Sequence, residues 1–187
     1  LARVLPVIDA LRSSGINTPV SIDTYKANVA EAALRQGADW INDVWALRAD
    51  PRMAAVAASF EAPLILMHNR SQPANAELQQ RLGGRYTGIT YTNLIREIND
   101  ELMESVAIAR SAGVTDDHII LDPGIGFGKT VEQNLELVNR LDEIKQLGFP
   151  VLLGASRKSF IGYTLDVPPE ERVEGTAAVC AIGIARG

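Results

Sequence analysis

Three polar side chains close apolar runs of the sequence, where parallel strands would bring them to a common binding site. The three residues are Asp23, Asn42 and Asp122. A carboxylate at the end of a buried strand is costly unless it meets a donor or a cation. Such a set suits a ring with adjacent N–H donors, such as a 2-amino-4-oxo pyrimidine, which a carboxylate can bind through two hydrogen bonds. Binding of a ring of this kind is the first hypothesis.

Local roles remain open as alternatives for two of these positions. Asp23 could instead cap the helix expected to begin near Tyr25, because aspartate is a favoured helix cap. Asn42 and Asp43 are neighbours at the end of one strand and compete for the same ligand-binding role. A cap at all three strand ends is less favoured than a cap at one.

The third strand end opens a glycine-rich run, Asp122 to Thr130, with glycine at alternate positions. Glycine lets the backbone turn tightly and approach a ligand closely. A Walker A phosphate loop fails on spacing because Pro123 stands where its first glycine belongs. The Gly-x-Gly-x-x-Gly pattern fails because Lys129 takes its third glycine position. The run is predicted to be a strand–turn–helix junction, either ligand-binding or only packing, with Lys129 a helix-start residue of unassigned role.

A second polar run, Ser156-Arg157-Lys158, follows the predicted strand that ends at Gly154. It offers a hydroxyl, a planar guanidinium and a point charge. Lys158 could neutralise a ring carbonyl or hold an anion, and a solvated basic turn is the alternative. His68 also follows a strand, but no ligand-spaced cysteine accompanies it, so a core histidine is favoured over zinc. The remaining candidates read as packing residues: Cys180, Trp40 and Trp45.

The elements that must position these residues alternate between strand and helix. Apolar runs predict strands over residues 19–23, 39–43, 63–68, 118–122 and 150–154. Helical periodicity predicts helices over residues 1–14, 25–36, 50–59, 94–113, 131–147 and 175–187. Asp50-Pro51 is expected to start the third helix, and the polar residues 69–92 form a candidate lid or partner surface. No hairpin signal joins two strands, so a parallel sheet covered by helices is predicted.

An open doubly wound sheet and a closed TIM (β/α)₈ barrel both fit this order. Polar residues at every strand end favour the barrel, in which all strand ends face one side. A barrel has eight strands and about 250 residues. The sequence therefore predicts a barrel truncated to about five βα units, a single domain over residues 1–187, with two strands missing before Leu1 and one after Gly187.

Composition excludes several classes of protein. The 187 residues are 47% hydrophobic, enough for one buried core. Eighteen basic against 23 acidic residues leave a net charge of −5 without a basic block, so nucleic acid is not an expected partner. No apolar run is long enough for a membrane span. A single cysteine fits a reducing compartment, and the expected location is the cytoplasm.

Successive motifs of the chain resemble those of the dihydropteroate synthase family. They are Ser21-Ile-Asp-Thr24, Ile41-Asn-Asp43, Leu66-Met-His68, the run from Leu121 to Thr130, Gly154-Ala-Ser-Arg-Lys158 and Gly175-Thr-Ala-Ala178. The resemblance implies a TIM barrel, usually a homodimer. It also implies a transferase that condenses 6-hydroxymethyl-7,8-dihydropterin diphosphate with 4-aminobenzoate, giving 7,8-dihydropteroate and diphosphate in folate biosynthesis with the help of Mg²⁺.

The resemblance also assigns roles to residues of this sequence. The catalytic set that it implies is Asp23, Asp122 and Lys158. The substrate-binding set is Asp23, Asn42, Met67, Asp122, Gly126, Phe127, Gly154, Ser156, Arg157 and Lys158. Within it, the residues that would hold the pterin are Asp23, Asn42, Asp122 and Lys158. Met67 would line the pterin slot, Phe127 and Ser156 would border the aminobenzoate pocket, and Arg157 would lie over the site.

In this family the diphosphate leaves a cationic methylene, which the aromatic amine attacks, so positioning and electrostatics carry the reaction without a protein nucleophile. The segments that ligate the metal and clamp the diphosphate are absent from this sequence, the metal ligand being expected upstream of Leu1. Two alternatives remain. One is a methyltetrahydrofolate methyltransferase-type barrel, which the Ser-Arg-Lys and glycine runs disfavour, and the other is an inactive barrel serving as a binding module.

Overall fold

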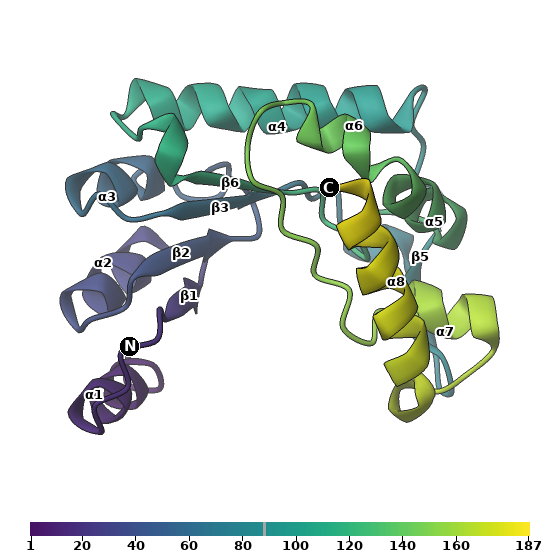
Figure 1. Ribbon diagram of the computed structural model, residues 1–187, viewed down its shortest axis with the longest axis horizontal. Helices are drawn as coiled ribbons and strands as arrows, with labels where there is room; N and C mark the ends of the chain where they lie inside the picture. The colour runs from purple at the N-terminus through teal and green to yellow at the C-terminus, as the bar shows by residue number, and fades with distance from the viewer. Residues whose placement is uncertain (88) are drawn as a thin grey trace. The chain divides into compact units, whose positions relative to one another are not determined.

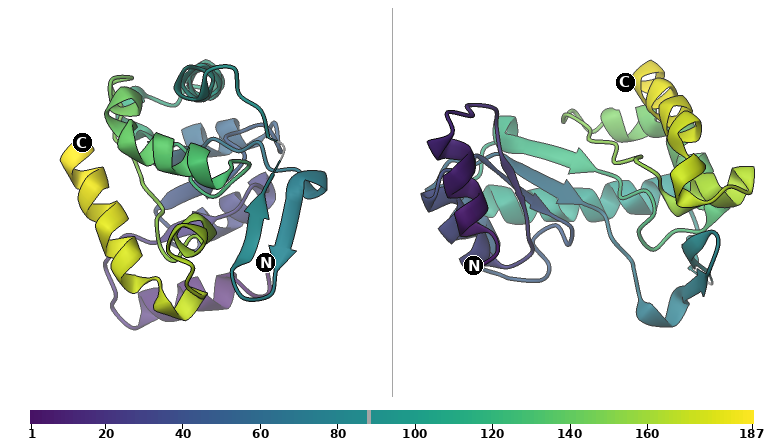
Figure 2. Two further views of the ribbon diagram at one scale, coloured as in Figure 1. Left: turned by 90° about the vertical axis from the view of Figure 1, so that its right-hand side faces the viewer. Right: turned by 90° about the horizontal axis from the view of Figure 1, so that it is seen from below.

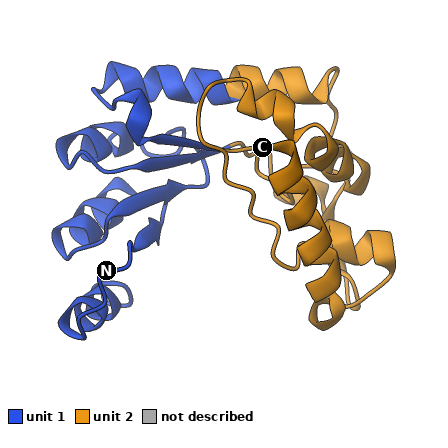
Figure 3. Ribbon diagram, in the orientation of Figure 1, with its two compact units in different colours: residues 1–67, 102–121 blue, residues 68–101, 122–187 orange. Residues whose placement is uncertain are grey.

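The computed structural model describes residues 1–87 and 89–187, which form two compact units. Unit 1 comprises residues 1–67 and 102–121, and unit 2 comprises residues 68–101 and 122–187 (Figure 3). Within the described residues, no helix combines the length and the apolar character that a membrane crossing requires.

Unit 1 is built on a sheet in the order β1-β2-β3-β6 (Figure 1). The strands are β1 (Ser21–Asp23), β2 (Trp40–Asp43), β3 (Leu64–Met67) and β6 (Ile119–Asp122). β2 pairs in parallel with both β1 and β3. All of β3 is buried, as expected of a parallel strand that is covered on both faces. The predicted parallel sheet is confirmed for β1, β2 and β3, and β6 lies next to β3 in the same sheet.

Three short helices accompany the first strands of unit 1. α1 (Leu5–Ser13) precedes β1, α2 (Ala27–Arg35) connects β1 to β2, and α3 (Met53–Ser59) connects β2 to β3. α2 packs against both α1 and α3. It buries Ala27, Ala30 and Ala33 at spacings of three residues together with Leu34, which is the apolar stripe of an amphipathic helix. The small side chains let these helices lie close together.

The longest helix is α4 (Leu94–Ser111), of which residues 94–101 belong to unit 2 and residues 102–111 to unit 1. The apolar positions that predicted it are buried, namely Leu94, Ile98, Leu102, Val106 and Ala109. Their spacing places them on one face. The early turns also carry Glu97 and Glu101 beside this buried face, and the partners of these two residues matter for the site.

Unit 2 contains α5 (Val131–Asn139), α6 (Leu141–Lys145), α7 (Ser159–Leu165) and α8 (Val173–Arg186). α5 packs against α7 and α8 and begins with a capping box in which Thr130 and Gln133 satisfy each other's backbone amides. One continuous helix over residues 131–147 was the expectation, and it is wrong. The helix breaks at Arg140, with φ −112° and ψ 26°. No glycine or proline stands at the break, and the apolar periodicity continues across it, so the sequence pattern did not indicate that the helix ends there.

Residues 69–92 contain a hairpin that the strand pattern did not predict. β4 (Ala76–Gln79) pairs antiparallel with β5 (Gly83–Tyr86), and Figure 2 shows the two strands side by side. Gly83 follows the short loop between these strands and has φ +72°, the left-handed conformation that three-residue hairpin loops favour. The two strands of the hairpin are mostly exposed, so they lack the apolar signal of the core strands. Short 3₁₀ turns complete the chain: η1 (Pro73–Asn75), η2 (Asp116–His118) and η3 (Pro169–Glu171).

The fifth predicted strand, residues 150–154, is not an extended strand. Val151 alone forms an isolated β-bridge there. The apolar run has the composition of a strand, but a strand also needs hydrogen-bonded neighbours along its length. In the described part of the chain this segment makes that pairing at one residue only.

Candidate functional site

The strand ends of unit 1 place Asp23 beside Asn42, which are paired in the register of β1 and β2. Asp23 is exposed. The Asn42 carbonyl accepts a hydrogen bond of 3.1 Å from the Thr24 amide. Its side-chain Oδ1 is buried and has no hydrogen-bond partner among the described residues. Since a buried acceptor is costly without a donor, this atom is suited to receive one from a ligand.

Asp43, the neighbour that competed with Asn42, has a structural role. It is fully buried, and its two oxygens accept from the amides of Trp45 at 2.9 Å and Leu47 at 2.8 Å. Burial raises the pKa of Asp43, although these hydrogen bonds and the charge of Arg48 act to lower it. Both Asp43 oxygens hold the turn after β2, and this supports Asn42 as the ligand-binding residue.

The capping alternative for Asp23 is wrong, because another aspartate serves the start of α2. Asp50 Oδ2 accepts from the Ala27 amide at 2.9 Å, and the N-cap residue Lys26 makes no side-chain cap. Asp50 was expected to start α3, whose N-cap is instead Arg52, also without a side-chain cap. Asp23 is thus not engaged by the adjacent helix.

Met67, which was expected to line the ligand slot, is 3% exposed at the end of β3.

In unit 2, Asp122 ends β6 as a buried carboxylate. Its side chain is 6% exposed, and Oδ1 accepts from the Gly124 amide at 2.7 Å. Burial raises the pKa of Asp122 to about 6, against the Gly124 hydrogen bond and the charges of Lys158 and Lys129. A Cβ added at Gly154 would lie 4.0 Å from Asp122 Oδ2. Since 4.0 Å is an ordinary van der Waals distance, residue 154 does not crowd the second carboxylate oxygen.

The glycine run after Asp122 forms the tight turn that the sequence predicted. Gly124, Gly126 and Gly128 have φ of +69°, +80° and +60°, which side-chain-bearing residues adopt only with strain. A Cβ at Gly128 would lie 2.4 Å from the Arg70 carbonyl carbon. Gly128 is therefore required both for its conformation and for the close approach of a second backbone segment.

Lys158 faces this turn from the second polar run. Its Nζ lies 4.1 Å from the centroid of the Phe127 ring, within cation–π range. Burial lowers the pKa of Lys158, and the charge of Asp122 opposes that effect. The side chain is half-buried, so the interpretation as a wholly solvated turn is wrong for Lys158.

The other members of that run, Ser156 and Arg157, are exposed. The Arg157 backbone is nevertheless fixed, with φ +49°. Its amide donates to Thr176 Oγ1 at 3.0 Å, and its carbonyl accepts from Arg172 Nη1 at 3.0 Å. Arg172 is 2% exposed and also donates to the Leu82 carbonyl at 2.9 Å. A buried arginine thus ties the hairpin loop to the turn that presents Arg157 and Lys158.

Lys129 is a site residue that sequence reasoning missed. It was expected only to start a helix, yet it is 2% exposed. Its Nζ donates to the carbonyls of Gly124 at 3.0 Å and Phe127 at 3.1 Å and lies 3.0 Å from His68 Nδ1. Burial lowers the pKa of Lys129 to about 7, with Asp122 and Glu101 opposing. His68 is buried as predicted, but it is part of a charged network and not of an apolar core.

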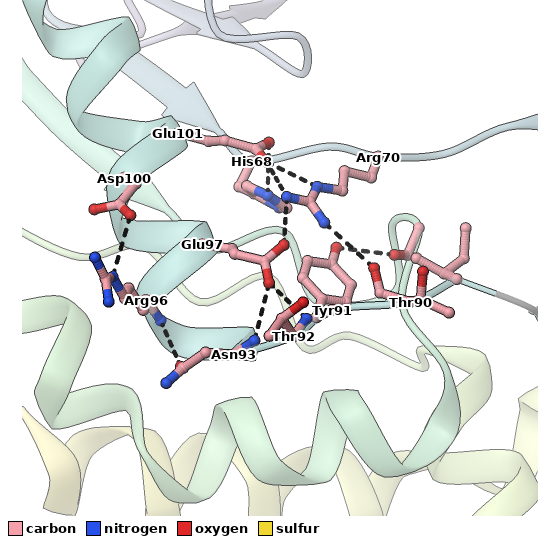
Figure 4. Close-up of polar contacts among 12 residues, drawn as sticks. His68, Arg70, Thr90, Tyr91, Thr92, Asn93, Arg96, Glu97, Asp100 and Glu101 are labelled. Atoms are coloured by element: carbon pink, nitrogen blue, oxygen red, sulfur yellow. Dashed lines mark hydrogen bonds and ion pairs between the residues drawn. The ribbon is translucent and has the colours of Figure 1, made fainter.

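The network continues from His68 through α4 (Figure 4). His68 Nε2 lies 3.1 Å from Glu101 Oε2, and Arg70 Nε donates to Glu101 Oε1 at 2.8 Å. Arg70 also pairs with Glu97 at 2.8 Å and lies 4.3 Å from the Tyr91 ring centroid. The hydrogen bond from His68, followed by Arg70, lowers the pKa of Glu101 to about 2 against the effect of burial. The spacing of Glu97 and Glu101 on one helix face was the available signal.

Comparisons with known proteins identify the family. The sequence matches the family described as pterin binding enzyme over residues 1–187. The chain belongs to the pterin-binding enzyme family. It is 52% identical to a dihydropteroate synthase of Clostridium beijerinckii, covering 98% of this chain and 62% of that protein. It is 46% identical to a dihydropteroate synthase of Bacillus subtilis, covering 100% of this chain and 60% of that protein.

A solved structure agrees with these relatives. The crystal structure of a Clostridium difficile dihydropteroate synthase in the presence of pteroic acid is 45% identical, with a TM-score of 0.88 over 100% of this chain and 65% of that one. The predicted fold class is confirmed, since this member of the family forms part of a TIM barrel. The chain spans about three fifths of the length of the curated relatives it matches.

Proposed function

We propose that this chain belongs to a dihydropteroate synthase, a transferase that joins 6-hydroxymethyl-7,8-dihydropterin diphosphate to 4-aminobenzoate and releases diphosphate. The observation that carries the proposal is the buried Asp122 carboxylate. Its Oδ1 accepts from the Gly124 amide, and its Oδ2 is not crowded by Gly154. Relatives from Clostridium beijerinckii and Bacillus subtilis bear the name of this enzyme. Their names favour the synthase over a methyltransferase-type barrel.

In this proposal two charged residues of unit 2, Asp122 and Lys158, bind the pterin ring through charge-assisted hydrogen bonds. With a pKa of about 6, Asp122 is mostly ionised at neutral pH and accepts from the ring N–H and the 2-amino group. Lys158, half-buried with its Nζ over the Phe127 ring, donates toward the ring carbonyl. Charge-assisted hydrogen bonds of this kind are the strong ones.

The remaining residues keep the roles that the family resemblance assigns, as parts of the same proposal. Asp23 and Asn42 bind the pterin, which the unpartnered Oδ1 of Asn42 supports. Met67 lines the pterin slot. The second substrate, 4-aminobenzoate, is bordered by Phe127 and Ser156. Gly126 and Gly154 leave room for the ligands, and Arg157 lies over the site.

The reaction requires these residues to position the two substrates and to stabilise the charge that develops on the pterin. As the carbon–oxygen bond to diphosphate breaks, the pterin methylene becomes cationic, and the amine nitrogen forms the new bond and releases a proton. Asp122 favours the cationic pterin electrostatically because its carboxylate is fixed in a buried setting of low polarity. Holding both reactants in line supplies the rest of the rate enhancement.

Several finer points are part of the proposal and await their own tests. Mg²⁺ would accompany the diphosphate substrate. In the chain outside residue 88, no group of three or more His, Cys, Asp or Glu side chains is placed to hold a metal. We propose one pterin-binding barrel domain over residues 1–187, acting as a homodimer in the cytoplasm. The single cysteine agrees with that compartment.

A diphosphate-release assay tests the proposal. The full-length protein is supplied with pterin diphosphate and Mg²⁺, with and without 4-aminobenzoate. We expect release that depends on the amine, with 7,8-dihydropteroate as the product. Release independent of the amine indicates hydrolysis. Absence of release, together with methyl transfer to a corrinoid protein, supports the alternative barrel.

A further inference from the structure

The buried ammonium of Lys129 has three N–H donors and three acceptors around it. A lysine ammonium carries three donors and no acceptor. Its Nζ lies 3.0 Å from the Gly124 carbonyl, 3.1 Å from the Phe127 carbonyl and 3.0 Å from His68 Nδ1. Each hydrogen therefore has one acceptor, and a cation that is 2% exposed is fully hydrogen-bonded.

Two of these acceptors bracket the turn that carries the proposed substrate contacts. The Gly124 carbonyl belongs to the residue whose amide binds Asp122 Oδ1 at 2.7 Å. The Phe127 carbonyl belongs to the residue whose ring lies under Lys158. One ammonium thus links both ends of the turn over residues 124–127. Displacing it would move the Asp122 and Phe127 contacts together.

The third acceptor connects Lys129 to a counter-charge. If His68 Nδ1 accepts from Lys129, its Nε2 carries the proton and lies 3.1 Å from Glu101 Oε2. Glu101 in turn accepts from Arg70 Nε at 2.8 Å. The order of charges is positive at Lys129, negative at Glu101 and positive at Arg70, with neutral His68 as the bridge. A buried charge is tolerated when it is paired in this way.

The same turn packs closely against the backbone of Arg70 and Ser71, which follow His68 in the chain. Gly128 approaches the Arg70–Ser71 peptide so closely that an added Cβ would be 2.6 Å from the Ser71 amide nitrogen. Tyr91 Oη donates to the Gly128 carbonyl at 3.1 Å. The segment over residues 68–71 and Tyr91, which precedes α4, therefore hold the glycine turn from outside the substrate contacts.

We propose that Lys129 is a positioning residue that sets the geometry of Asp122 and Phe127 for the pterin, with His68 and Glu101 as the relay that orients it. The inference rests on the proposed function and adds a residue to it. Lys129 does not itself touch the substrate. Its role requires the protonated ammonium, because the neutral amine has only two hydrogens for the three acceptors.

The first test replaces the ammonium and keeps the aliphatic stem. In the full-length protein, Lys129→Met is compared with Lys145→Met, which removes the same charge from an exposed position on α6. Calorimetry measures the dissociation constant of pteroic acid for each. We expect a loss of affinity of tenfold or more for Lys129→Met and less than twofold for Lys145→Met. Equal affinities in two folded variants overturn the inference.

The second test is a pH profile, which a merely structural lysine would not change. The charged groups that face Lys129 are Asp122 from β6, Glu101 from α4, Arg70 after β3 and Lys158 before α7. We expect the ratio of wild-type to Lys129→Met affinity to fall as pH rises through the lysine's titration. Titration of the ligand cancels from this ratio. A ratio that is constant with pH overturns the role of the ammonium.

A relay variant keeps the inference testable if Lys129→Met does not fold. Glu101→Gln removes the negative charge that favours protonated Lys129, so its affinity for pteroic acid should begin to fall at a lower pH than in the wild type. An unchanged profile overturns the relay. If the wild type itself does not bind pteroic acid, the proposed function fails, and the inference fails with it. Wild-type binding with unaffected variants refutes the inference alone.

Discussion

The most buried charged side chains of the two units are held in different ways. In unit 1, Asp43 is satisfied by the amides of Trp45 and Leu47, two and four residues further along the chain. In unit 2, Lys129 meets His68 across 61 residues, and Arg172 meets Leu82 across 90. The first arrangement is a local turn. The second exists only when distant segments have already come together.

This difference separates residues that the fold needs from residues that the proposed chemistry needs. The local hydrogen bonds of Asp43 leave Asn42 as the strand-end side chain with an unsatisfied oxygen in unit 1. In unit 2 the long-range contacts of Lys129 act on the turn that begins at Asp122. A site built on rigid partners keeps its geometry better than one built on a free loop. Changes in unit 2 should therefore affect binding through the turn.

The largest effect on stability is expected at Gly128, where the backbone of Arg70 packs against the glycine turn. Gly128→Ala would place a Cβ 2.4 Å from the Arg70 backbone at φ +60°. The left-handed backbone costs about 1–2 kcal/mol and the overlap about 1–3 kcal/mol more. We expect the free energy of unfolding, measured by urea titration, to fall by about 3 kcal/mol.

A glycine of unit 1 provides the matched control for this substitution. Gly15 has a similar φ of +79°, but an added Cβ would meet nothing within 4 Å. Gly15→Ala should therefore cost about 1–2 kcal/mol, the conformational part alone. If both substitutions cost the same, the turn in unit 2 is not clamped by Arg70.

The next effect concerns the proposed ligand contact. Asp122→Ala should weaken the binding of pteroic acid by roughly 1.5–3 kcal/mol, the range for hydrogen bonds to charged groups. Isothermal calorimetry measures it, with Asp100→Ala on the exposed side of α4 as the control. An affinity that stays at the wild-type value after removal of Asp122 would remove this residue from the pterin site.

The buried network also predicts a pH dependence of stability. The pKa of Glu101 is lowered to about 2 from an ordinary value of 4.5, so the native state binds fewer protons than the unfolded state between these values. The stability that Glu101 contributes is complete above pH 4.5 and is lost as the pH falls toward 2. Its size is about 1–2 kcal/mol after allowance for partial exposure.

Glu101→Gln should flatten that acid limb of the stability profile, measured by urea titration at a series of pH values. Asp122 acts with the opposite sign, because its pKa is raised to about 6 and its ionisation therefore costs stability as the pH rises toward 6. Asp122 is present in both proteins, so the difference between the profiles isolates Glu101. Parallel profiles would show that Glu101 is not held as an ion in the native state.

The smallest effect is expected at the surface of unit 1. Glu31 pairs with Arg35 at 2.8 Å on α2, with both side chains well exposed. Glu31→Gln should change the free energy of unfolding by less than about 0.5 kcal/mol, and salt should remove even that. A larger loss than for Glu101→Gln would contradict the contrast between exposed pairs in unit 1 and the buried network in unit 2.

Local sequence patterns were sufficient for the features that local physics governs. Apolar runs predicted β1, β2, β3 and β6, and the glycine spacing predicted the turn after Asp122. The same patterns missed the hairpin of β4 and β5, whose side chains are largely exposed, and they missed the break at Arg140. Residues 150–154 looked like a strand because apolar composition cannot reveal whether a neighbouring strand is present.

By itself the sequence determined the order of the core strands β1, β2, β3 and β6 and the presence of Asp23, Asn42 and Asp122 at the ends of these strands, because backbone geometry and apolar periodicity act over a few residues. Only the tertiary structure decided what Lys129 and His68 do. A lysine at a helix start and a histidine after a strand have no distinguishing local pattern. Their roles depend on partners tens of residues away, Lys129 on His68 and His68 on Glu101, and on the burial that makes an unpaired charge costly there.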